Sequence, residues 1–101
     1  RIMQKLTADE AAQQVAALDG WTLEDGAAAI HRDFHFADFK TAWAFMTEVA
    51  AEADLMDHHP EWSNVYNQVS IRLTTHDAGG LTALDLNLAI RIDAAARKTV
   101  K

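Results

Sequence analysis

Two adjacent histidines, His58 and His59, are the residues in this sequence best suited to proton-transfer chemistry. They lie in the segment Asp54-Leu-Met-Asp-His-His-Pro-Glu-Trp62, with carboxylates before and after them. Imidazole titrates at roughly pH 6.5, so either ring can give or take a proton at cellular pH. A neighbouring carboxylate such as Asp57 can hold one imidazole tautomer and raise its basicity. Alone, this cluster is weak evidence for a catalytic site, because adjacent histidines on a loop are more often structural or solvated than catalytic.

A zinc site is the main alternative for these histidines. Zinc needs three or four ligands that converge on one point, and His58, His59, His76 and a carboxylate could supply them. Neighbours in an extended chain point in opposite directions, however, which makes His58 and His59 a poor chelating pair. His31 and His35 have a helical metal spacing, but the alternation around them indicates a strand, where they would lie about 13 Å apart. We therefore expect no metal and no other cofactor.

Composition excludes several other kinds of chemistry and partner. The absence of cysteine removes disulfides, thiolate catalysis and cysteine-ligated metals. No serine lies in a nucleophile-elbow context, and no Gly-rich phosphate loop is present. The net charge of −6 argues against direct contact with nucleic acid. No apolar run approaches the roughly 20 residues of a membrane span, and no signal peptide is visible. We expect a cytoplasmic protein that binds neither nucleic acid nor membrane.

The first third of the chain predicts one short helix and two strands. The T-x-x-E capping box of Thr7–Glu10 predicts a helix that stops near Gly20. Residues 21–23 are expected to form a short strand, followed by a turn at 24–26. Within residues 28–36, Ile30, Phe34 and Phe36 alternate with His31, Asp33 and His35, which is typical of a half-exposed strand with Arg32 as the one exception.

The middle of the chain carries the strongest helix signal. Asp38 is a good N-cap, and Pro60 is expected to end the extended segment that follows the helix. The aromatic residues and Met46 of this helix are expected to lie in the core. Its apolar residues, at three- and four-residue spacings, are Phe39, Ala42, Trp43, Met46, Val49, Ala50 and Ala53.

The last third predicts a hairpin and a final helix. Residues 62–66 and 69–75 are rich in strand formers and are joined near Asn67-Gln68. A helix begins at Thr82, with the charge of Asp85 favourably placed in its first turn. Its two apolar stripes are Leu84, Leu88, Ile92 and Ala95, and Leu86 with Ile90. One stripe can meet the sheet and the other a second subunit.

These elements form a single predicted domain over residues 1–101, in the order α-β-β-α-β-β-α. Hairpin-joined strands form an antiparallel sheet, and the helices can then cover one of its faces. The expected fold class is α+β. A domain of this size buries only a modest share of its surface, so assembly with further copies is plausible.

The spacing Asp54-x3-His58-His59-Pro60-x5-Tyr66-x9-His76-x8-Asp85 resembles the signature of the pterin-4a-carbinolamine dehydratase family. The similarity runs from about residue 6 to about residue 97, and it departs from the family at Asp54, where well-known members carry glutamate. Further matching segments are Gly20-Trp21, Phe34-His35-Phe36, Asp38-Phe39, Phe45-Met46-Thr47, Asp57-His-His-Pro-Glu-Trp62, Asn64-Val-Tyr-Asn67, Thr75-His76 and Gly80-Leu81.

This resemblance implies helices on one face of a four-stranded antiparallel sheet, and an assembly into dimers or tetramers. The implied substrate is 4a-hydroxytetrahydrobiopterin or a related pterin, left by an aromatic amino acid hydroxylase, and the products are quinonoid dihydropterin and water. Members also resemble dimerisation cofactors that bind a homeodomain transcription factor through a helical surface. A protein-binding coactivator is therefore the alternative function, with or without enzyme activity. A pterin-binding module that does no chemistry is a third possibility.

The resemblance also implies the site. His58 and His76 are the leading acid/base candidates, and His59 positions the pterin and can share the proton transfer. The full set of predicted substrate-binding residues is Asp57, His58, His59, Thr74, Thr75, His76, Asp77 and Asp85. Asp57 is expected to orient a histidine, and the residues around His76 offer backbone groups to the flat pterin edge. A plain helix-start role for Asp85 is equally plausible, and packing is favoured over pocket lining for Trp21 and Trp62.

Overall fold

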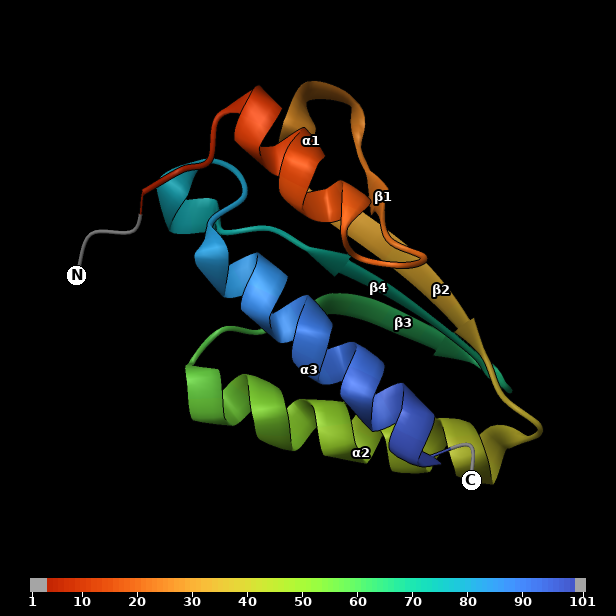
Figure 1. Cartoon of the computed structure of the whole chain (residues 1–101). Coiled ribbons are helices and arrows are strands. Elements are labelled where there is room, and N and C mark those ends of the chain that lie inside the picture. Colours follow the sequence, from red (N-terminus) through yellow and green to blue (C-terminus); the bar gives the residue numbers. More distant parts are fainter. Residues whose placement is uncertain (1–3, 100–101) are drawn as a thin grey trace.

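The computed structural model describes residues 4–99, which form three α-helices on one face of a four-stranded antiparallel sheet (Figure 1). The predicted α+β class and element order are confirmed. Two short 3₁₀ helices, Asp25–Ala27 and His76–Ala78, complete the chain. The main elements are α1 (Ala8–Ala16), β1 (Thr22–Leu23), β2 (Ile30–His35), α2 (Phe39–Met56), β3 (Glu61–Val65), β4 (Gln68–Leu73) and α3 (Ala83–Thr99). No helix within the described range is long and apolar enough to cross a membrane.

The sheet has the strand order β1-β2-β4-β3, so the hairpin β3–β4 lies beside the hairpin β1–β2. Ile30 pairs with Leu73, and Trp62 pairs with Ile71. Side chains alternate between the two faces of a strand, so these pairs lie on the same face, against the helices. The opposite face, which we call the open face, carries His31, Asp33, His35, Glu61, Ser63, Val65, Gln68, Ser70 and Arg72. The strand predicted within 28–36 is confirmed over Ile30–His35, so His31 and His35 lie on a strand and not on a helix.

Side chains fix the starts of the first two helices. The Thr7 hydroxyl accepts from the Glu10 N–H at 3.1 Å, and the Glu10 carboxylate accepts from the Thr7 N–H at 2.8 Å. This confirms the predicted capping box. Asp38 caps α2 by accepting from the Thr41 N–H at 2.8 Å, also as predicted. The first helix ends at Ala16, a turn before the predicted stop.

The prediction that the aromatic residues of the expected stripe, Phe39 and Trp43, lie in the core is wrong, and the stripe omitted the buried Phe45. Phe45 is fully buried, but Phe39 is 47% and Trp43 57% exposed. These two rings stack on one another, with centroids 6.2 Å apart. The helix carries two neighbouring apolar stripes, and only the stripe that contains Ala42, Phe45, Val49 and Ala53 packs inward. Helical periodicity alone does not say which stripe meets the core.

Two details of the last third also differ from the prediction. The β3–β4 turn consists of Tyr66 and Asn67, one residue earlier than expected, and Tyr66 has a φ of 51°. The Asn64 amide fixes this turn by donating to the carbonyls of Tyr66 and Gln68, at 3.1 and 2.7 Å. In α3, the predicted second stripe is divided, because Leu86 is buried whereas Ile90 is exposed.

Candidate active site

A cavity of about 250 Å³ lies between the end of α2 and the segment that follows β4. Seven of the eight predicted substrate-binding residues line it: Asp57, His58, His59, Thr74, Thr75, His76 and Asp77. The structure thus brings the three histidines around one space, although 16 residues separate His59 from His76 along the chain. The eighth residue, Asp85, is fully buried and lies behind this lining.

Local backbone geometry places the histidine pair directly after α2. Asp57 ends the helix in the left-handed conformation, with a φ of 51°. The His58 N–H then donates to the Ala53 carbonyl at 3.1 Å. This bond returns the chain to the helix end and keeps His58 buried. Asp57 therefore shapes the site through its backbone, and the carboxylates that bond the histidines are other residues.

The second half of the lining is a tight turn after β4. Thr75 and Gly80 form an antiparallel bridge, and the Thr75 N–H donates to the Gly80 carbonyl at 3.0 Å. The 3₁₀ turn between them ends at Gly79, whose φ of 75° favours glycine. This turn presents His76 at the mouth of the cavity with its side chain exposed.

Asp85 forms the most shielded contact of the site. Its Oδ1 lies 2.5 Å from His58 Nε2, and the two side chains are 0% and 10% exposed. Its Oδ2 accepts from the Thr75 hydroxyl at 2.7 Å and from the Thr82 N–H at 3.0 Å. Asp85 therefore fills the helix-start role and also holds a histidine of the cavity.

The other two histidines have carboxylate partners closer to solvent. His59 Nε2 lies 2.9 Å from Asp54 Oδ1, so the shorter side chain at position 54 still reaches its histidine. His76 Nε2 lies 2.7 Å from Glu61 Oε2. All three imidazoles use Nε2 for this contact, and no described side chain bonds their Nδ1 atoms. Nδ1 is thus the ring nitrogen left to exchange a proton with a ligand.

Sequence reasoning missed Glu61. It begins β3 and pairs in register with Arg72 on β4, whose guanidinium bonds it at 2.8 Å. The hydrogen bond from Arg72, followed by the one from His76, holds the pKa of Glu61 below its usual range. The available signal was the position of Glu61 in the family motif, but its contacts depend on a strand register that the sequence does not state.

The two tryptophans pack rather than line the cavity, in agreement with the favoured expectation. Trp21 is buried and donates its indole N–H to Asp93, and Trp62 packs against the core. Within residues 4–99, no three histidine or carboxylate side chains converge so that they could hold a metal ion. The arrangement found is three separate imidazole–carboxylate pairs around one cavity.

Comparisons with known proteins agree on one family. Residues 4–95 match the sequence profile described as Pterin 4 alpha carbinolamine dehydratase. A relative from Paraburkholderia xenovorans, provisionally named a pterin-4-alpha-carbinolamine dehydratase, is 54% identical over 91% of this chain and 96% of its own. A relative from Rhizorhabdus wittichii with the same provisional name is 53% identical over 93% and 97%.

Solved structures agree with the fold. A crystal structure described as a transcriptional coactivator/pterin dehydratase from Brucella melitensis is 46% identical and has a TM-score of 0.89. The match covers 92% of this chain and 99% of that one. A pterin dehydratase-like protein described as a RuBisCO assembly factor is 23% identical, with a TM-score of 0.66, and supports the fold alone.

Proposed function

The chain belongs to the pterin 4 alpha carbinolamine dehydratase family, and we propose that it removes water from a pterin 4a-carbinolamine in the histidine-lined cavity. The observation that carries the proposal is the convergence of His58, His59 and His76 on one space, each with its own carboxylate partner. Such pairs fix the imidazole tautomer and stabilise its protonated form, which suits proton transfer in both directions.

The reaction needs these groups and no change of oxidation state. Carbon 4a of the substrate bears a hydroxyl and a ring N–H. As the nitrogen lone pair forms the C=N bond, the C–O bond breaks, and a general acid protonates the departing hydroxide to give water. A general base then takes the proton from the ring nitrogen, which yields the quinonoid dihydropterin. Positioned acids and bases contribute about 10²- to 10⁴-fold in rate.

We assign the acid/base roles to His58 and His76. Asp85 holds His58 away from water, and Glu61, which pairs with His76, is itself fixed by Arg72. The partner of His59, Asp54, is 83% exposed and has no second side-chain contact among the described residues, so positioning of the pterin is the better role for His59. Asp57, Thr74, Thr75 and Asp77 complete the cavity as substrate-binding residues, and Asp85 acts through His58.

The proposed natural substrate is 4a-hydroxytetrahydrobiopterin or a close relative, produced when an aromatic amino acid hydroxylase uses its cofactor. An enzyme that recycles the hydroxylase cofactor acts in the same compartment as the hydroxylase, so the proposed location is the cytoplasm. A flat heterocycle suits a cavity whose lining combines imidazole, carboxylate and hydroxyl groups.

A dehydration assay tests the function. Freshly generated 4a-hydroxytetrahydropterin is mixed with the full chain, and its loss is followed by absorbance against buffer and against a denatured sample. We expect a rate well above buffer that a metal chelator does not change. A rate equal to buffer would overturn the dehydratase proposal, and loss of activity with the chelator would contradict its metal-free chemistry.

Protein binding is the second candidate function. The Brucella melitensis relative is described as a coactivator as well as a pterin dehydratase. This chain exposes the stacked pair Phe39–Trp43 on α2 and Ile90 on α3, which suits contact with another copy or a transcription factor. Light scattering of the wild type and of a Phe39→Ser/Trp43→Ser double variant checks self-association. We expect an oligomer that this double variant weakens, and a wild-type monomer would contradict the oligomer.

A further inference from the structure

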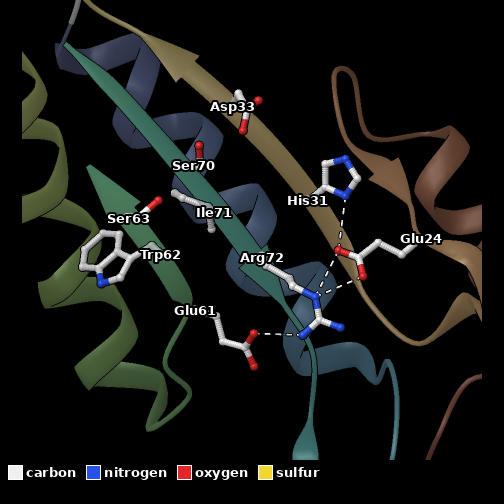
Figure 2. Close-up of a pocket in the computed structure, with 9 residues that line it drawn as sticks. All are labelled: Glu24, His31, Asp33, Glu61, Trp62, Ser63, Ser70, Ile71 and Arg72. Carbon is white, nitrogen blue, oxygen red and sulfur yellow. Dashed lines mark hydrogen bonds and ion pairs between the residues drawn. The ribbon is translucent and has the colours of Figure 1, made fainter. Parts of the chain in front are cut away.

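Glu61 lies between two hollows of the molecule. Its Oε2 bonds His76, which lines the candidate active site, and its Oε1 bonds Arg72 on the open face of the sheet. Glu61 and Arg72 also line a hollow of about 370 Å³ over that face (Figure 2). The two oxygens of one carboxylate are thus divided between a histidine of the cavity and a guanidinium outside it.

Arg72 also bonds a second carboxylate, that of Glu24. Its Nε donates to both oxygens of Glu24 at 3.0 Å, and Glu24 Oε2 lies 3.2 Å from His31 Nδ1. Figure 2 shows Arg72 between the two glutamates, with Glu24 reaching it from beyond β2 and Glu61 from β3. Because the guanidinium is planar and its donors are fixed, it sets the direction of the Glu61 carboxylate.

The ionisation of Glu61 follows from these contacts. The hydrogen bond from Arg72 contributes most to the lowered pKa of Glu61, and His76 adds to it. Glu61 is therefore ionised throughout the range in which imidazoles exchange protons, and it can accept from His76 Nε2–H at any of those pH values. The other titratable residues that line the cavity with His76 are Asp57, His58, His59 and Asp77.

We propose that Glu61 is the positioning residue of His76, and that Arg72 fixes the Glu61 carboxylate so that His76 keeps Nε2 on it and Nδ1 for the ligand. The inference rests on the proposed function, because it assumes that His76 transfers a proton. The proposed role of Glu61 is to orient the His76 ring, not to stabilise the fold. Exposed ion pairs stabilise folded proteins little, and both His76 and Glu61 are exposed.

The chain offers a matched control for a test of Glu61. Glu24→Gln removes the same charge from the same guanidinium, but Glu24 contacts His31 instead of His76. Glu61→Gln removes the carboxylate that touches His76. Glu61→Asp keeps the charge with a shorter side chain. Circular dichroism melts of all three variants verify that each is folded.

The experiment is the pH–rate profile of dehydration, with kcat and KM resolved, for the wild type and the three variants. For Glu61→Gln we expect kcat to fall about tenfold across the profile, with KM within about threefold of the wild type. Glu24→Gln, which reaches His76 only through Arg72, should lower kcat less than Glu61→Gln does, and Glu61→Asp should recover part of kcat. The same profile for Glu61→Gln and Glu24→Gln, with an active wild type, would overturn this inference alone. A wild type without turnover would remove the proposed function and this inference together.

Discussion

His58 and Asp85, 27 residues apart in the chain, meet through a 2.5 Å contact between Nε2 and Oδ1, with side chains that are 10% and 0% exposed. The second oxygen of Asp85 accepts from Thr75 and from the backbone N–H of Thr82. One carboxylate therefore joins the loop after α2, the end of β4 and the start of α3. The histidine cavity is held by a residue of the first turn of the last helix.

Replacing Asp85 with asparagine should lower both stability and activity. The amide cannot accept at every position where the carboxylate does, so a buried donor of Thr75, Thr82 or His58 loses its partner. We expect a loss of about 1–3 kcal/mol in the free energy of unfolding, measured by urea denaturation. The control is Asp77→Asn, because Asp77 lines the same cavity but is exposed. Equal stability of the two variants would contradict the structural role of Asp85.

Replacing Asp54 with asparagine should affect substrate binding more than turnover. Asp54 and His59 are both exposed, and their 2.9 Å contact orients a histidine to which we assign positioning. We expect KM to rise about threefold to tenfold, kcat to stay within about twofold, and thermal stability to stay unchanged. Asp54→Glu, which supplies the residue of well-known family members, should keep the wild-type KM. A fall in kcat alone for Asp54→Asn would instead assign His59 a direct proton-transfer role.

Asp93 should make part of the stability depend on pH. It accepts from the Trp21 indole and from Arg32, yet burial raises its pKa against these contacts. A raised folded pKa means that the folded state holds the proton more tightly than the unfolded chain. The resulting stabilisation is complete below the unfolded value of about 3.9 and is lost as pH rises through the folded pKa.

Urea denaturation between pH 3.5 and pH 7 checks this, with Asp93→Asn as the reference that cannot ionise. As pH rises from about 4, the wild type should lose stability relative to Asp93→Asn. A difference between the two proteins that is constant with pH, or that changes in the opposite sense, would show that burial does not dominate the ionisation of Asp93.

The sequence predicted the elements better than the contacts between them. Alternation identified β2 and β4, and helical spacing identified α2 and α3, because each pattern reflects the period of its own element. The outward stacking of Phe39 and Trp43 was missed, because two apolar stripes on one helix look alike before the fold selects one.

The histidines of the site could be predicted from the sequence, but the carboxylates that bond them could not. His58, His59 and His76 could be selected by residue type, and the family resemblance placed them together. The carboxylates that bond them depend on tertiary geometry. The Glu61 carboxylate is oriented by Arg72, which lies opposite it in the register of β3 and β4. Asp85 reaches His58 only because α3 starts behind the cavity. Asp57 looked like the natural partner because it is adjacent in the chain, but its position at the helix end gives it a backbone role.

The most direct test of the account is single-turnover dehydration of 4a-hydroxytetrahydropterin by the wild type, His58→Gln, His76→Gln and the double variant. Each protein is first shown to be folded by circular dichroism. We predict a fall of about 10²-fold or more for the double variant, and a smaller fall for each single variant. A folded double variant that dehydrates the pterin as fast as the wild type would contradict the claim that these histidines carry the reaction.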